Sequence, residues 1–228
     1  MTASKLTQVL LVEDHAVVRQ SLCRLLEAEG RCGVVGQAKN GREAVEMAAA
    51  LSPNVILMDI AMPILNGHEA TRQIIAANPA ARILVLSAHS DNVYVQRMTL
   101  AGAVGFLEKQ TSVAILIHAI HEVAAGRSYF SPAITRRTAA AGRMAGKFGR
   151  TRDGHAGLLT ARESQVLQLV AEGQSNKEAA VTMGISIKTI EKHRQHLMNK
   201  LHLHDTAGLT RYAMVHGVIE SCVHVTIT

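Results

Sequence analysis

The sequence contains few cysteines, namely Cys23, Cys32 and Cys222 among 228 residues. An odd number tells against a fully paired disulfide framework, and the spacings do not match those of a zinc site. Proteins of the reducing cytosol commonly show this pattern. The cysteines therefore exclude a disulfide-stabilised secreted domain and favour the cytosol.

Long apolar runs are also missing. No segment reaches the roughly 20 uncharged apolar residues that a membrane-spanning helix needs. The N-terminus reaches the acidic Glu13 and Asp14 after a short apolar run, without the basic start and long apolar stretch of a signal peptide. We expect a soluble, cytoplasmic protein with no membrane partner.

Positive charge is unevenly distributed along the chain, whose net charge is +6. Residues 1–126 contain 10 basic and 11 acidic residues, whereas residues 127–228 contain 14 basic and 7 acidic residues. This asymmetry predicts a near-neutral domain followed by one that binds a polyanion, and nucleic acid is the obvious candidate. Because 48% of the residues are hydrophobic, the chain has enough apolar material to form real cores.

The first part of the chain alternates short β-rich runs with amphipathic stretches. This alternation predicts an α/β fold, a small doubly wound parallel sheet made of five βα units. The expected strands span residues 9–12, 34–37, 55–58, 83–86 and 104–107, and the expected helices span 15–28, 41–51, 68–77, 92–101 and 113–125.

The rest of the chain has helical signals. Residues 127–157 contain interleaved glycine and arginine and are predicted to form a flexible basic linker. Thr160 with Glu163, and Ser175 with Glu178, are capping-box pairs that each begin a helix. Four helices are expected, at about 160–171, 175–183, 186–201 and 205–216. We therefore predict domains at residues 1–126 and 158–228, the second being small and all-α.

A cluster of acidic residues is predicted at one edge of the sheet. Asp59 ends the buried strand 55–58, and Glu13 and Asp14 follow the strand 9–12. If these strands are parallel neighbours, three carboxylates converge where ligands bind in open α/β sheets. Like charges at such a site need a divalent cation, and an all-oxygen ligand set suits Mg²⁺. For Asp59 alone, capping the following turn is the simpler interpretation.

Two more strands end in residues that suit phosphate chemistry. Ser87 follows the strand 83–86 and Lys109 follows the strand 104–107. A hydroxyl and an ammonium group are the kinds of group that stabilise a transferred phosphoryl group. No glycine-rich anion cradle follows the first strand, which tells against a dinucleotide or flavin site.

With these residues in place, the segment 7–126 resembles the receiver domain of two-component systems. The resemblance implies a flavodoxin-like (βα)5 fold in which Asp59 is the phosphoacceptor. It also implies that Glu13, Asp14, Asp59 and the Ala61 carbonyl hold Mg²⁺. Ser87 and Lys109 are then expected to bind the phosphoryl group, and Phe106 to act as the aromatic switch in a position where relatives usually carry Tyr.

A second resemblance covers residues 158 to about 219. The run 159–163, the run 172–180, and Ser186 with the segments 188–193 and 200–201 resemble the LuxR-type helix-turn-helix. Ala179 departs from the pattern, since a larger aliphatic residue is usual there. Together, the two resemblances imply a response regulator of the NarL/FixJ class.

The third helix of this segment is expected to contact DNA. Its apolar residues share one face, and polar and basic residues lie opposite, as major-groove recognition requires. The resemblance places Glu191, Lys192 and Gln195 nearest the bases. Contacts to phosphates are expected from Lys177, Lys188, Thr189, His193 and Lys200.

These features imply a transcription regulator rather than an enzyme that turns over a substrate. Its expected partners are a sensor histidine kinase, double-stranded promoter DNA, a second copy of the chain when phosphorylated, and RNA polymerase. Two alternatives stay open. One is a phosphorylation-independent DNA-binding protein with a vestigial receiver, and the other is an aspartyl-phosphate phosphohydrolase. The second is disfavoured because Ala61 stands where such enzymes carry a second Asp.

Overall fold

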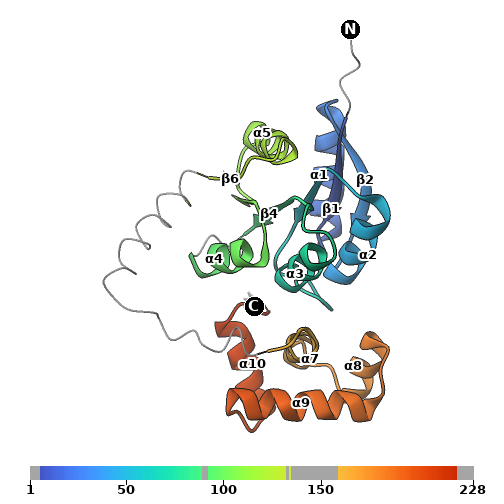
Figure 1. Cartoon of the computed structure of the whole chain (residues 1–228), viewed down its shortest axis with the longest axis vertical. Helices are drawn as coiled ribbons and strands as arrows, with labels where there is room; N and C mark the ends of the chain where they lie inside the picture. The colour runs from blue at the N-terminus through green and yellow to red at the C-terminus, as the bar shows by residue number, and fades with distance from the viewer. Residues whose placement is uncertain (1–5, 89–91, 132–133, 135–158, 220–228) are drawn as a thin grey trace, which may run out of the picture. The chain divides into compact units, whose positions relative to one another are not determined.

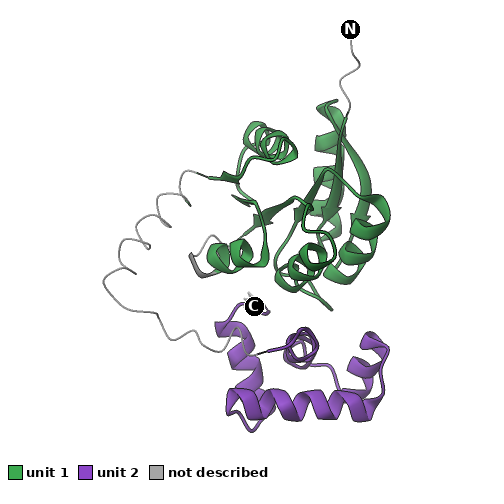
Figure 2. Ribbon diagram, viewed as in Figure 1, with its two compact units in different colours: residues 1–151 green, residues 152–228 purple. Residues whose placement is uncertain are grey.

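The computed structural model describes residues 6–88, 92–131, 134 and 159–219. The chain forms two compact units, unit 1 at residues 1–151 and unit 2 at residues 152–228, as Figure 2 shows. In the part of the chain that is described, no helix is both long and apolar enough to cross a membrane.

Unit 1 is built on a parallel sheet with the strand order β2-β1-β3-β4-β5-β6 (Figure 1). Helices alternate with the strands along the chain, which confirms the predicted doubly wound α/β fold. The strands are β1 (Thr7–Val12), β2 (Cys32–Ala38), β3 (Val55–Met58), β4 (Ile83–Ser87), β5 (Gly105–Glu108) and β6 (Tyr129–Phe130). The helices among the described residues of this unit are α1 (Ala16–Ala28), α2 (Gly41–Leu51), α3 (Gly67–Ala77), α4 (Asn92–Ala101) and α5 (Val113–Ala124).

Each face of the sheet supports its own core. Side chains alternate along a strand, so Ile56 of β3 belongs to one apolar cluster and Leu57 to the other. Helices α2, α3 and α4 cover the first cluster, and α1 and α5 cover the second. With both faces covered, β1, β3 and β4 each contain a continuous apolar run, at residues 9–12, 55–58 and 83–86.

The sixth strand was not predicted. Residues Tyr129 and Phe130 pair in parallel with Gly105 and Phe106 of β5. A strand of two residues is too short to produce an alternating pattern, so the sequence gives no signal for it. The sheet therefore continues past the expected domain boundary at residue 126, and Ile134 is also buried, in the cluster that contains Phe106. Most of the remaining linker segment, including 135–157, lies outside the described residues.

The described residues of unit 2, 159–219, form four helices around one apolar cluster. They are α7 (Ala161–Ala171), α8 (Asn176–Met183), α9 (Ile187–Leu201) and α10 (Thr206–Val215). Both predicted capping boxes are present, at Thr160 with Glu163 and at Ser175 with Glu178. Ala179 is fully buried in the cluster, so the smaller side chain is accommodated within a closed core.

Candidate functional site

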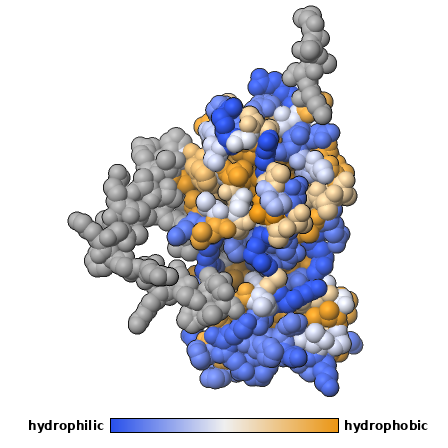
Figure 3. All heavy atoms as spheres, viewed as in Figure 1, coloured by the Kyte–Doolittle hydropathy of each residue, from blue (hydrophilic) through white to orange (hydrophobic). Residues whose placement is uncertain are grey.

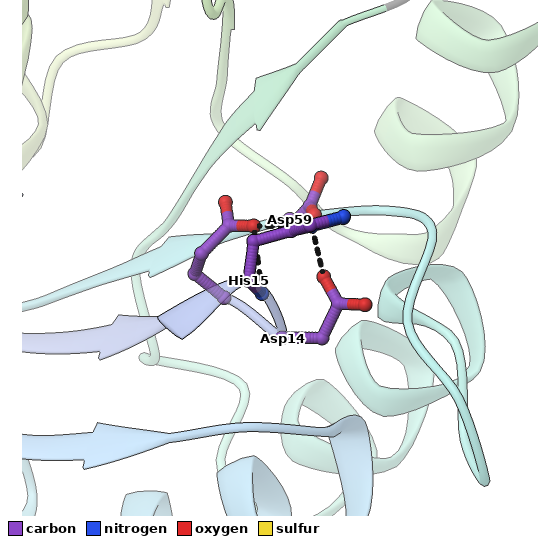
Figure 4. A group of neighbouring side chains, drawn as sticks. Asp14, His15 and Asp59 are labelled. Carbon is purple, nitrogen blue, oxygen red and sulfur yellow. Dashed lines mark hydrogen bonds and ion pairs between the residues drawn. The ribbon is translucent and has the colours of Figure 1, made fainter. Parts of the chain in front are cut away.

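The acidic residues converge at the carboxyl ends of β1 and β3. These strands are hydrogen-bonded neighbours in which Val12 pairs with Met58, so Glu13 and Asp59 leave the sheet side by side. Ligand oxygens of Glu13, Asp14 and Asp59, together with a nitrogen of His15, lie within 4.8 Å of one another. Figure 4 shows the side chains of Asp14, His15 and Asp59 directed toward a common point.

Lys109 follows β5, which lies two strands away from β3, and its side chain connects Glu13 and Asp59. Its Nζ atom lies 2.9 Å from Asp59 Oδ2 and 2.8 Å from Glu13 Oε2. The Lys109 amide donates to the carbonyl oxygen of Ser87 at 2.8 Å, which fixes the start of this side chain beside the end of β4. Burial lowers the pKa of Lys109, but the charges and hydrogen bonds of Asp59 and Glu13 outweigh it and raise that pKa above its usual value.

Asp59 is only 5% exposed, and its environment opposes ionisation. Burial is the main reason that its pKa rises from 3.8 to about 6, and the nearby charge of Glu13 adds to the effect. Lys109 and the Ile60 amide, which donates to Asp59 Oδ1 at 2.8 Å, partly offset this rise in pKa. The carboxylate is thus held in a fixed orientation and is costly to ionise without a cation.

The donor atoms fit a hard divalent cation. Glu13, Asp14 and Asp59 contribute oxygen ligands, as Mg²⁺ prefers. Asp14 Oδ1 is buried without a hydrogen-bond partner, although His15 Nδ1 lies 2.8 Å away. The two observations agree if the imidazole N–H points instead to Glu13 Oε1, at 3.1 Å. An orphaned buried carboxylate oxygen is a suitable ligand for a cation.

The loop after Asp59 is held close to the acidic residues. The Gly67 amide donates to the Ile60 carbonyl at 2.7 Å, and a Cβ atom at position 67 would lie 2.0 Å from the Asp59 carbonyl oxygen. Only glycine allows this approach of α3 to the loop. Ala61, the expected carbonyl ligand, lies in this loop and is half-buried.

Ser87 and Phe106 lie on the neighbouring strands. Ser87 is the last residue of β4 and is 3% exposed, at the edge of the sheet that carries Asp59. Phe106 of β5 is 1% exposed and belongs to the cluster that includes Val95 and Met98 of α4. The aromatic ring therefore lies inside the unit, between the sheet and α4.

In unit 2, α9 presents an apolar stripe to the core and a polar face to solvent. Ile190, Leu197 and Leu201 form the buried stripe, and the surface over α9 is largely hydrophilic in Figure 3. Of the residues expected to contact DNA, Thr189, His193 and Lys200 are half-buried, whereas Lys177, Lys188, Glu191, Lys192 and Gln195 are exposed.

Family comparisons match both units. Residues 9–121 match the response regulator receiver domain, and residues 157–213 match the luxR family of bacterial regulatory proteins. The transcriptional regulatory protein MctR of Rhizobium johnstonii is 36% identical over 220 residues, which cover 96% of this chain and 99% of MctR. The transcriptional regulatory protein DegU of Brevibacillus brevis is 34% identical, over 93% of this chain and 95% of DegU. The chain belongs to the LuxR-family response regulators.

Solved structures agree with this assignment. A LuxR-family two-component response regulator from Aurantimonas sp. SI85-9A1 superposes with a TM-score of 0.58 at 34% identity, over 60% of this chain and 98% of that structure. The RcsB response regulator of Salmonella typhimurium has a TM-score of 0.56 at 24% identity, over 92% of this chain and 99% of that structure. The RcsB comparison supports the fold alone.

Lys200, a predicted DNA contact of this response regulator, has a charged partner inside its own unit. Lys200 Nζ lies 2.7 Å from Glu163 Oε2, the carboxylate that also accepts hydrogen bonds from the amide and hydroxyl of Thr160. Lys200 therefore joins the end of α9 to the start of α7. The sequence shows the capping box but not this third contact, because it depends on how the helices pack.

Sequence reasoning overlooked two polar residues of this response regulator. His15 belongs to the acidic group, and the charge of Asp14 is the main reason that its pKa is raised. Its position next to Glu13 and Asp14 could have indicated this. Arg194 was also missed, although a charged residue one turn after the buried Ile190 breaks the apolar stripe of α9.

Proposed function

We propose that this response regulator accepts a phosphoryl group on Asp59 from a sensor histidine kinase. Phosphorylation then promotes homodimerisation and controls sequence-specific binding to promoter DNA. The observation that carries the proposal is the position of Lys109, whose Nζ atom bridges Asp59 and Glu13 within the group of acidic residues that also contains Asp14. The relatives MctR and DegU are called transcriptional regulatory proteins, which supports the same function.

The transfer forms one bond and breaks one. An Asp59 carboxylate oxygen attacks the phosphorus of a phosphohistidine, the new P–O bond replaces the P–N bond, and the imidazole leaves. Glu13, Asp14, Asp59 and the Ala61 carbonyl would hold Mg²⁺, which would offset the negative charge of the carboxylates and of the phosphoryl oxygens. Lys109 supplies a second cation and orients the acceptor.

Phosphorylation changes the contacts of the switch residues. The phosphoryl group adds roughly −1.5 to −2 of charge where Glu13 and Asp14 already lie. Lys109 therefore exchanges part of its contact with Glu13 for the phosphoryl oxygens, and the Ser87 hydroxyl turns toward them. The ring of Phe106, buried against α4, follows Ser87 and alters the surface of unit 1.

Unit 2 supplies the contacts to DNA. Glu191, Lys192 and Gln195 are exposed on α9 and read base edges in the major groove. Phosphates are contacted by Lys177, Lys188, Thr189, His193 and Lys200, where Lys200 also keeps its contact with Glu163.

The sequence places a receiver at residues 1–126, a basic linker at 127–157 and a helix-turn-helix domain at 158–228; because β6 pairs with β5, we propose that the receiver extends past residue 126 to include Tyr129 and Phe130. We place the protein in the cytoplasm, where the kinase domain, promoter DNA and RNA polymerase are accessible.

Labelling with radioactive acetyl phosphate tests the proposal. The full chain is expected to take up one phosphoryl group when Mg²⁺ is present and to lose labelling in EDTA. Asp59→Asn is expected to abolish labelling, whereas Asp205→Asn, a matched change at the cap of α10, is expected to keep it. Undiminished labelling of Asp59→Asn would show that the acceptor is another residue. No labelling of the wild type would favour a vestigial receiver, and steady release of phosphate from phosphate esters would favour a hydrolase.

A further inference from the structure

The core-facing stripe of α9 contains an arginine. Ile190, Leu197 and Leu201 are buried, and Arg194 lies one turn after Ile190 on the same side of the helix. A half-buried arginine at this position costs side-chain entropy and desolvation compared with an aliphatic residue. Such a break in a local pattern commonly marks a position with a functional role.

The Arg194 side chain joins α9 to two other helices. Its Nη1 atom donates to Asn176 Oδ1 at 3.1 Å, and its Nη2 atom donates to the hydroxyl of Thr206. Asn176 is the first residue of α8 and Thr206 is the first residue of α10. One planar guanidinium group therefore fixes where α8 and α10 begin relative to the middle of α9.

Neither contact is needed to cap a helix. The side chain of Ser175 already caps α8, and the side chain of Asp205 already caps α10. A cation is also disfavoured near a helix N-terminus, because the helix dipole is positive at that end. The contacts of Arg194 thus contribute geometry, since the helix termini do not depend on them for capping.

We infer that Arg194 is a positioning residue that sets the register between base contacts and phosphate contacts. Lys192 and Gln195, proposed to read bases, flank Arg194 along α9, and Lys177, proposed to bind phosphate, follows Asn176. Holding α8 against α9 fixes the distance between these two kinds of contact, on which sequence discrimination depends. This inference rests on the proposed DNA-binding function.

The test compares binding to two DNA duplexes by the phosphorylated full chain. One duplex is selected by the wild type from a random pool, and the other is a scrambled version of it. Arg194→Lys keeps the positive charge but cannot present two donors in a fixed plane. Its preference for the selected duplex is expected to fall about tenfold, with unchanged affinity for the scrambled duplex and an unchanged salt dependence.

Two further variants separate positioning from folding. Thr206→Val and Asn176→Ala each remove one acceptor and leave Arg194 intact, so each is expected to lose part of the preference with circular dichroism like that of the wild type. Arg162→Lys, at an exposed position of α7, is the matched control and is expected to bind as the wild type does. In a Lys192→Ala background, the effect of Arg194→Lys is expected to shrink.

Three results contradict the inference. The first is an unchanged preference for the selected duplex in Arg194→Lys, and the second is an unchanged preference in both acceptor variants. The third is an equal loss of affinity for both duplexes in Arg194→Lys, with a salt slope lowered by about 1, which is the signature of a direct phosphate contact. If the wild type itself shows no sequence preference, the proposed DNA-binding function fails instead, and the two failures are thereby distinguished.

Discussion

Asp59→Asn is expected to stabilise unit 1 at neutral pH while abolishing phosphorylation. The pKa of Asp59 is raised from 3.8 to about 6, mainly by burial, so ionising this carboxylate costs more in the folded than in the unfolded chain. Two pKa units correspond to about 3 kcal/mol. Asparagine avoids this cost, and because Lys109 then keeps only Glu13 as its ionic partner, about 3 kcal/mol is an upper limit.

The pH dependence follows from linkage. Between about pH 4 and pH 6 the folded wild type binds more protons at Asp59 than the unfolded chain does, so the contribution of Asp59 to stability falls as pH rises through this window. The advantage of asparagine is therefore largest above about pH 6 and disappears below about pH 4. Added Mg²⁺ stabilises the wild type more than the variant and narrows the difference.

Calorimetry of the full chain in EDTA measures the effect. At pH 7.5 the transition of unit 1 is expected to rise by at most about 12 °C, since about 4 °C per kcal/mol is typical for a domain of this size. The transition of unit 2 is the internal control and is expected to stay unchanged. A lower transition temperature of unit 1 in Asp59→Asn at pH 7.5 would refute the reasoning, because the ion pair with Lys109 would then outweigh the cost of burial.

Four other substitutions have distinct expected outcomes. In a filter-binding assay, Lys192→Ala is expected to weaken binding to the selected duplex and to relax the sequence preference, whereas Lys177→Ala is expected to weaken binding to all DNA and to flatten its salt dependence. Equal, sequence-independent losses of affinity in both variants would contradict the assignment of Lys192 to bases and Lys177 to phosphates. Lys200→Met is expected to lower the stability of unit 2 by only about 1 kcal/mol in urea unfolding, because Glu163 keeps its hydrogen bonds to Thr160 and Lys200 is 37% exposed. An unchanged urea midpoint would show that the ion pair between Lys200 and Glu163 does not contribute to stability. Gly67→Ala is expected to lower both the transition temperature of unit 1 and its labelling by acetyl phosphate, because the new Cβ atom would lie 2.0 Å from the Asp59 carbonyl oxygen. If both quantities stay at their wild-type values, the backbones at Gly67 and Asp59 are not packed this closely.

The helices and the five longer strands were predictable because each has a local signal. The capping pairs beginning at Thr160 and Ser175 lie where the sequence indicates, and the short continuous apolar runs correspond to strands of a sheet covered on both faces. Strand β6 was not predictable, because two residues produce no pattern and its pairing partner Gly105 is more than twenty residues earlier.

The sequence alone determined which residues stand at the carboxyl ends of the strands, since strand length and alternation fix where Glu13, Asp14, Asp59 and Lys109 occur. Only the tertiary structure decided how these groups act on one another. The raised pKa of Asp59 comes from burial by distant parts of the chain, and the contacts of Lys109 depend on strand order. The same holds for Arg194, whose partners are 18 and 12 residues away. Periodicity shows which face a side chain occupies, but packing decides what it touches.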